Sequence, residues 1–166
     1  MANVDAPNGL KAVRHLTGGA VRTEEFKIAS GLSTAIFTGD CVKLLSTGYI
    51  DECDAGDRIL GVFAGCKYTK SSGEPIFSRQ WTASLATLGS ADVTAYVYDD
   101  PNIVFAVQSA GSADFADIGN LADIVATAGD TSTGQSNHEV SGTTGTGTAG
   151  LRILGLYNEP KNAYGT

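Results

Sequence analysis

The residues that could carry chemistry fall in a few short stretches of the sequence. One stretch, Ser136-Asn137-His138-Glu139, supplies a hydroxyl, an imidazole and a carboxylate, the groups used in nucleophile–base catalysis. Residues adjacent in sequence do not form a triad, and the sequence lacks the G-x-S-x-G turn that presents a nucleophilic serine. We therefore expect no enzyme. The alternative, a small hydrolase, would need a pocket that gathers His15 or His138 with a serine and an aspartate.

A second stretch has the spacing of a nucleotide-binding loop. Gly145, Gly147 and Gly150 match G-x-G-x-x-G, a motif that lets a pyrophosphate approach a helix N-terminus directly after a strand. Here the glycines precede the strand-like residues 151–157, and no apolar strand leads into them. The pattern therefore predicts a flexible loop and no cofactor.

Metal-binding patterns are weak. Cys41, Cys53 and Cys66 are an odd number without C-x-x-C spacing, which predicts free, buried thiols in a reducing compartment. A zinc site would have to recruit the two histidines from opposite ends of the chain. The aspartate pairs 99/100 and 114/117 lack the D-x-[DN]-x-[DN]-G pattern of a calcium loop. We expect no metal; a weak ion at an interface is the alternative.

The elements that would position these residues are short strands. The chain has 166 residues, 21 of them Gly, and only 17% are charged, a composition that suits tight turns between strands and suits a helical bundle poorly. We predict an all-β fold, barrel-like or sandwich-like, with Gly-Asp turns and at most one or two short helices. The expected strands are 22–28, 35–37, 41–45, 49–53, 58–66, 75–83, 93–98, 103–108 and 151–157. Residues 93–98 and 103–108 are expected to form a hairpin, residues 118–126 a short helix, and residues 127–150 a surface loop or a weak pair of strands.

One phrase occurs twice. Arg58-Ile59-Leu60-Gly61-Val62-Phe63 returns as Arg152-Ile153-Leu154-Gly155-Leu156-Tyr157. Two similar β-rich subunits ending at 58–63 and 152–157 would explain the repetition, and so would a shared strand pattern. We divide the chain into an extended N-terminal arm (1–30), a β-rich domain (31–157) and a C-terminal tail (158–166).

The charge distribution argues against nucleic-acid binding. The net charge is −7, and no Lys or Arg occurs between Gln80 and Leu151. Binding to a phosphate backbone needs clustered basic residues. The sequence shows neither a signal peptide nor an apolar run of membrane-spanning length, so we expect no membrane partner. The expected arm, in contrast, is mildly basic.

Several phrases resemble those of the decoration, or cement, proteins of tailed-bacteriophage heads, over nearly the whole chain and in order. The similar phrases are Pro7-Asn8-Gly9-Leu10-Lys11-Ala12-Val13-Arg14-His15, Ile28-Ala29-Ser30-Gly31, Thr34-Ala35-Ile36-Phe37-Thr38-Gly39-Asp40, Gly56-Asp57-Arg58-Ile59-Leu60-Gly61-Val62-Phe63, Val107-Gln108, Asp117-Ile118-Gly119-Asn120, Ala122-Asp123-Ile124-Val125, Thr133-Gly134-Gln135-Ser136 and Leu151-Arg152-Ile153-Leu154-Gly155-Leu156.

This resemblance implies a β-rich virion protein, without catalytic residues, that binds the outer surface of an assembled capsid and reinforces it. The implied partners are the major capsid protein and further copies of the chain, with a trimer favoured over a dimer. The implied location is the capsid surface, after assembly in the host cytoplasm. From the basic character of the arm, we predict that capsid or subunit contacts involve Asn8, Lys11, Arg14, His15 and Arg22. A head-fibre or tail protein is the alternative within the virion.

Overall fold

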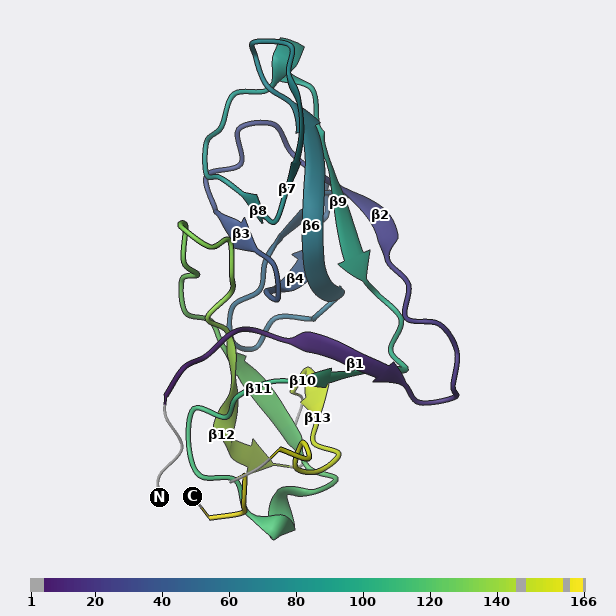
Figure 1. Cartoon of the computed structure of the whole chain (residues 1–166), viewed down its shortest axis with the longest axis vertical. Coiled ribbons are helices and arrows are strands. Elements are labelled where there is room, and N and C mark those ends of the chain that lie inside the picture. The colour runs from purple at the N-terminus through teal and green to yellow at the C-terminus, as the bar shows by residue number, and fades with distance from the viewer. Residues whose placement is uncertain (1–4, 146–148, 160–161, 166) are drawn as a thin grey trace.

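Short antiparallel strands make up nearly all the regular structure of this protein (Figure 1). The computed structural model describes residues 5–145, 149–159 and 162–165. Within these residues the helices are two single 3₁₀ turns, η1 (Leu88–Ser90) and η2 (Phe115–Asp117). The predicted all-β fold is confirmed. Neither turn is long and apolar enough to cross a membrane.

The upper half of the molecule is built on a six-stranded sheet with the order β2-β9-β6-β4-β5, to which β7 adds by pairing with β6 (Figure 1). Its strands are β2 (Glu24–Ile28), β4 (Cys41–Leu44), β5 (Ile50–Glu52), β6 (Gly61–Thr69), β7 (Pro75–Ser78) and β9 (Val93–Tyr98). Strands β2 and β5, at the two ends of this order, approach each other, so the sheet curls toward a barrel. The short pair β3 (Ile36–Phe37) and β8 (Gln80–Trp81) lies beside it.

The lower half contains two smaller sheets. One pairs β1 (Lys11–His15) with β10 (Ile103–Ala106), and the other has the order β12-β11-β13. The strands of the second sheet are β11 (Leu121–Val125), β12 (Glu139–Gly145) and β13 (Leu151–Arg152).

One bent ribbon connects the halves. The antiparallel pair β2–β9 runs in the upper sheet, and the antiparallel pair β1–β10 continues it in the lower half. On one side of the ribbon the connection is the loop 16–23, and on the other it is the turn 99–102, which is closed by the bond from the Ile103 N–H to the Asp100 carbonyl oxygen (3.1 Å). A further bond from the Leu16 N–H to the Asn102 carbonyl oxygen (2.8 Å) joins the two connections at the bend.

The ribbon corrects two expectations. Strands 93–98 and 103–106 both exist, but they enter different sheets and do not pair as a hairpin. Within the expected arm, residues 11–15 and 24–28 are strands that pair inside this chain. The arm therefore is not an irregular extension. The strand at 24–28 lies within the expected strand 22–28, whereas the strand at 11–15 was not predicted, because its bulge between Ala12 and Arg14 interrupts the two-residue alternation.

Two apolar cores stabilise these sheets. The first fills the curled upper sheet around Phe63 and Trp81, both fully buried. Strand β9 shows why the sequence folds this way: Val93, Ala95 and Val97 are buried while the residues between them are half-buried, the two-residue period of a strand. The second core lies between the halves and is formed by Leu10, Cys41, Cys53, Val62 and Ile124.

Residues 118–126 do not form the expected helix. Residues 121–125 form β11, in which Ala122 and Ile124 are buried and their neighbours are half-buried. This alternation has the period of a strand, and Gly119 (φ +90°) separates it from the preceding 3₁₀ turn. The helical spacing of the apolar residues is real in the sequence, but pairing with β12 and β13 determines the structure.

The two copies of the R-I-L-G phrase occupy different environments. Gly61 begins β6, the long central strand of the upper sheet, whereas Leu151 and Arg152 form a short strand at the edge of the lower sheet. Residues 58–60 and 153–157 lie outside the strands. The repeated phrase therefore does not form the same strand twice.

Candidate functional site

The described residues contain one buried group of side chains able to do chemistry: Asp40, Glu52 and His138. One potential ligand atom of each lies within 4.8 Å of the other two. His138 Nε2 is 2.9 Å from Glu52 Oε1 and 3.4 Å from Asp40 Oδ1. An imidazole thus faces two carboxylates inside the protein.

Three separate segments position this cluster. Asp40 lies directly before β4, and its Oδ2 accepts the Phe37 N–H (2.6 Å) across the tight turn made by Gly39 (φ +101°). Glu52 is the last residue of β5 and lies on the same strand face as the buried Ile50. His138 directly precedes β12, and its backbone N–H donates to Ser136 Oγ (2.9 Å).

The hydrogen bonds assign the proton of the His138 ring. The Cys41 N–H donates to Nδ1 (3.3 Å), so Nδ1 is the unprotonated nitrogen. Nε2 then carries the proton and donates it to Glu52 Oε1. Both ring nitrogens are engaged, and the ring orientation is fixed by β4 and β5.

Burial controls the electrostatics of the cluster. Asp40 and His138 have no exposed surface, while the Glu52 side chain retains 21% exposure. Burial raises the pKa of Asp40 to about 6, and this effect is only partly offset by the neighbouring His138 and by the hydrogen bond from the Phe37 N–H. Asp40 Oδ1 is buried without a hydrogen-bond partner.

The cluster is not arranged for nucleophilic catalysis. Ser136, His138 and Asp40 do lie together, but Ser136 Oγ accepts a backbone N–H and makes no bond to the imidazole among the described contacts. All three residues are fully buried. A shallow hollow of about 330 Å³ lies elsewhere, beside β6 and β7, and contains Lys67, Tyr68 and Asp92 but neither histidine.

The five residues predicted to make capsid contacts lie close together along the N-terminal segment. They differ in whether their side chains are already paired within the chain. His15 Nε2 is paired with Asp100 Oδ2 (3.0 Å), and Arg22 forms an exposed ion pair with Glu24 (2.9 Å). Asn8 is exposed, and its carbonyl oxygen accepts the side-chain amide of Gln135 (2.7 Å). Lys11 and Arg14 are exposed in β1 and have no ion-pair partner within the described residues.

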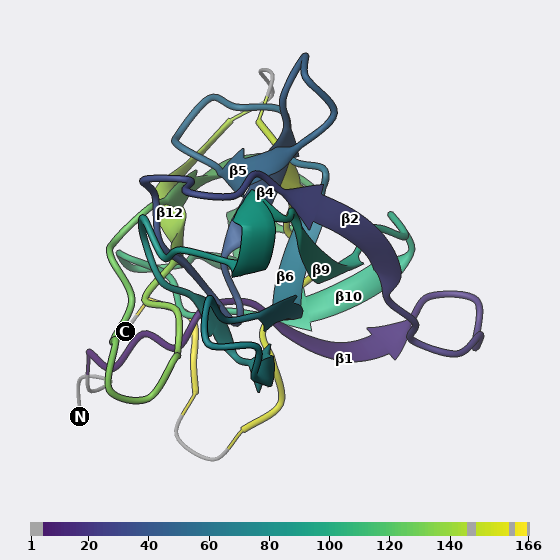
Figure 2. The ribbon, with the colours of Figure 1, turned by 90° about the horizontal axis from the view of Figure 1, so that it is seen from above.

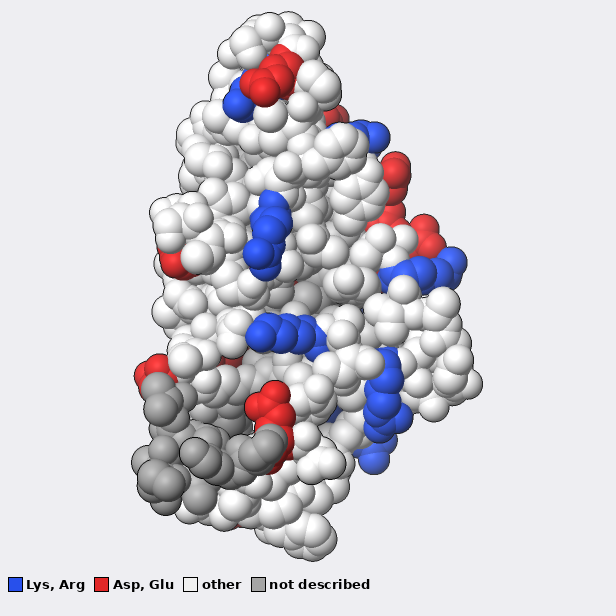
Figure 3. Space-filling view, in the orientation of Figure 1, with Lys and Arg blue, Asp and Glu red and all other residues white. Residues whose placement is uncertain are grey.

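The surface that contains these residues is both basic and apolar; we name it the β1 flank. It consists of residues 11–22 and includes the exposed Val13, Leu16 and Val21 as well as the three basic residues Lys11, Arg14 and Arg22. Residues 6–23 contain no Asp or Glu. Figure 3 shows Lys and Arg side chains over β1, and in Figure 2 the loop after β1 stands away from the body. The bulge at Val13 helps to keep both Val13 and Arg14 exposed.

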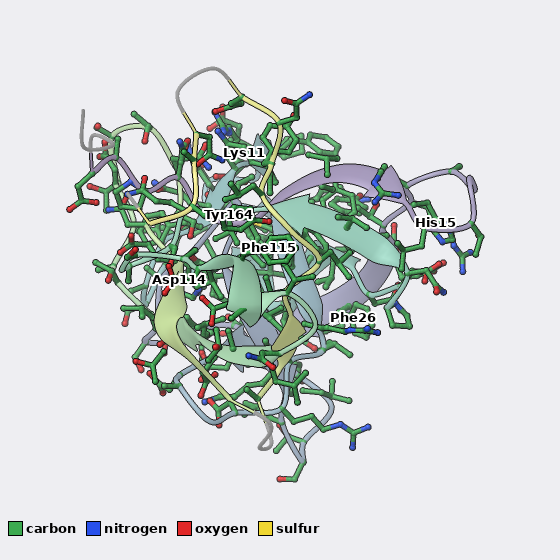
Figure 4. All side chains as sticks on the ribbon, turned by 90° about the horizontal axis from the view of Figure 1, so that it is seen from below. Lys11, His15, Phe26, Asp114, Phe115 and Tyr164 are labelled. Atoms are coloured by element: carbon green, nitrogen blue, oxygen red, sulfur yellow. The ribbon has the colours of Figure 1, made fainter. Side chains whose placement is uncertain are left out.

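A second exposed apolar surface lies at the lower end of the molecule; we name it the lower-end surface. It is formed by Phe115, Ile118, Leu154 and Tyr157, which are between 39% and 73% exposed. Phe115 packs edge-on against Tyr164 with ring centroids 5.6 Å apart, as the view from below shows (Figure 4). The Gly119 N–H donates to the Ile153 carbonyl oxygen (2.9 Å) and joins the two segments that carry this surface.

The remaining residues that the sequence suggested for chemistry have structural roles or lie outside the described residues. Asp114 and Asp117 form a capping box on η2, and Asp117 also accepts the Thr144 hydroxyl. Asp100 accepts the Asn102 N–H (2.8 Å) within its own turn. Gly145 ends β12, and Gly147 of the glycine motif lies outside the described residues. The three cysteines are buried and unpaired, as predicted.

Sequence reasoning missed the buried cluster because its members are far apart in the chain. Two signals were available: Asp40 adjoins a strand that begins with buried residues, and Glu52 shares a strand face with Ile50. A carboxylate on a buried face usually has a specific partner. No protein-family model, curated protein or solved structure matches this chain.

Proposed function

We propose that this protein is a virion structural protein that binds the outer surface of a bacteriophage head and stabilises the capsid. The link to phage heads is the sequence resemblance over nearly the whole chain. The structural observation that carries the proposal is the β1 flank, a basic and apolar surface on an otherwise acidic protein. It offers a partner both charge and apolar contact area without presenting a reactive group.

The proposed capsid contact uses a preformed surface. β1 is held by β10, and Leu10, directly before it, is buried, so residues 11–15 of the flank lose little conformational freedom on binding. Exposed Lys11 and Arg14 would pair with acidic groups of the major capsid protein, while Val13, Leu16 and Val21 would pack against its apolar groups.

We further propose that several copies act together, with a trimer as the favoured assembly. The lower-end surface leaves a large aromatic side chain, Phe115, 73% exposed, and aromatic residues carry much of the binding energy at protein interfaces. An oligomer that bridges neighbouring capsid subunits would gain avidity of roughly 10²–10⁴ over a single contact. Light scattering on wild type and on Phe115→Ser tests this assembly: the variant should shift toward the monomer, and an unchanged mass would contradict the proposed interface.

Co-sedimentation with assembled, undecorated shells of the phage concerned tests the capsid contact. Wild type should saturate the shells at hundreds of copies and increase their resistance to heat. Lys11→Glu/Arg14→Glu should weaken binding at least tenfold. The matched control, Arg58→Glu/Arg152→Glu, makes the same change in charge at exposed positions outside the flank and should bind normally.

Two outcomes would contradict this proposal. Absence of wild-type binding to intact shells would favour a fibre or tail protein, which fractionated virions would locate. Equal weakening by both charge-reversed variants would show that overall charge, and not the β1 flank, governs binding.

A further inference from the structure

We infer that Asp40, Glu52 and His138 form a binding site for a divalent transition-metal ion of the zinc class. The inference is independent of capsid binding. It is carried by the spacing of the three side chains and by one buried oxygen that has no hydrogen-bond partner.

The spacing suits a metal ion. Zinc–nitrogen and zinc–oxygen bonds are about 2.0–2.2 Å long, so neighbouring ligands around a tetrahedral ion lie roughly 3.3–3.6 Å apart. His138 Nε2 lies 3.4 Å from Asp40 Oδ1 and 2.9 Å from Glu52 Oε1. The distance to Glu52 is the shorter of the two, and a small outward movement of this partly exposed side chain would lengthen it to the separation expected around an ion.

The donor types narrow the choice of ion. One imidazole nitrogen and two carboxylate oxygens suit zinc and its neighbours among the transition metals. Calcium needs six to eight oxygen ligands and is a poor match for three donors that include nitrogen. Three protein ligands leave a coordination position for water on the side where Glu52 is exposed.

Asp40 Oδ1 is the second, independent indication. It is buried and accepts no hydrogen bond, although the other oxygen of the same carboxylate accepts the Phe37 N–H. Buried acceptors without partners are rare because losing water is not compensated. Oδ1 faces His138 Nε2, the position where an ion would be held between the two residues.

Metal binding requires one rearrangement of a proton. The ion needs the lone pair of Nε2, so the ring proton now on Nε2 must move to Nδ1 with no net release. The Cys41 N–H then loses its long bond to Nδ1 (3.3 Å). This loss predicts moderate affinity, and the exchange of tautomer provides a spectroscopic signature.

The ion would join three separate segments of the chain. Asp40 and Glu52 belong to the upper sheet, through β4 and β5, and His138 leads into β12 of the lower sheet. A bound metal would therefore link the two halves of the molecule next to the second core, to which Cys41 and Cys53 both belong.

The test uses the full chain after removal of metals with a chelator. Zn²⁺ is titrated in and followed by calorimetry, thermal unfolding and ¹⁵N NMR of the histidine rings. Glu52→Gln is the key variant, because its amide oxygen can still accept the Nε2 proton and should preserve the metal-free fold. His15→Gln is the control that removes the other histidine of the chain, which lies beside Asp100 on the surface.

We expect one Zn²⁺ per chain, a higher melting temperature with Zn²⁺, and a change of His138 from the Nε2–H to the Nδ1–H tautomer. Glu52→Gln should lower the affinity at least tenfold, and His15→Gln should leave it unchanged. The inference is overturned if wild type binds no Zn²⁺, if His138 keeps its tautomer, or if only His15→Gln reduces binding.

Discussion

His15 Nε2 lies 3.0 Å from Asp100 Oδ2, so the last residue of β1 is paired with the turn that connects β9 to β10. The second carboxylate oxygen, Oδ1, accepts the Asn102 N–H of the same turn (2.8 Å). The contact therefore fastens the bent ribbon at the point where it passes from the upper half to the lower half.

Asp100 should contribute stability that depends on pH. The hydrogen bond from the Asn102 N–H, followed by that from His15, lowers the pKa of Asp100 from 3.8 to about 2. Because the folded state favours the carboxylate, this contribution is present above pH 4 and is lost as the pH falls through about 2. Asp100→Asn should have a lower melting temperature than wild type at pH 7, and the difference should shrink between pH 4 and pH 2. Asp99→Asn is the neighbouring control, and a difference that stays constant to pH 2 would contradict the assignment.

Gly61 should not tolerate a side chain. A Cβ at this position would overlap the Tyr98 carbonyl oxygen on the neighbouring strand, forcing β6 and β9 apart. We expect Gly61→Ala to lower the free energy of unfolding by about 1–3 kcal/mol, the usual range for overpacking. Gly111→Ala is the control, since its Cβ would meet only Gly142 Cα at 3.4 Å. Denaturant titration of both variants measures the difference, and equal stabilities would contradict the overlap.

Truncation distinguishes an integrated N-terminal segment from a free arm. Removal of residues 1–15 deletes β1 and the buried Leu10, whose N–H donates to the Gly39 carbonyl oxygen (2.9 Å). The free energy of unfolding should fall by at least about 2–5 kcal/mol, the range for losing one buried leucine. Removal of residues 1–7 is the milder control and should retain most of the stability. If both truncated chains unfold like wild type, residues 8–15 do not contribute to the core.

The cysteines should be unreactive in the folded protein. Burial raises the pKa of Cys53 and Cys66 to about 12 and that of Cys41 further still, so almost no thiolate is available at neutral pH. A thiol reagent should label all three residues rapidly in denaturant and very slowly under native conditions. Ser71→Cys, at an exposed position, should react at once and validates the assay. Rapid native labelling of the wild type would contradict the burial.

The sequence predicts strands better than it predicts their partners. Residues 93–98 alternate clearly and form β9, because a half-buried strand imposes a two-residue period on its own side chains. The pairing of β9 with β2 and β6 depends on contacts far away in the chain. The expected hairpin was wrong for this reason. Residues 99–102 do form a turn, but the chain passes through it from the sheet that contains β9 to the sheet that contains β10.

The candidate site was less predictable than the fold. Lys11 and Arg14 were proposed as contact residues from local charge alone, and the structure leaves both exposed. His138 and Asp40 carry no local signal of their contact, since neither has a motif and the strand order alone brings them together. The segment 121–125 shows the same limit, because its residues fit a helix and a strand about equally until their neighbours are known.

The bent ribbon has a consequence for how the protein unfolds. Its two sides pass through both halves of the molecule, and the second core lies where the halves meet. If one half unfolded, the other half would lose packing in the shared core and the support of the continuous ribbon. We therefore expect that neither half unfolds independently of the other. A calorimeter should record a single cooperative transition, with a van't Hoff enthalpy equal to the calorimetric one.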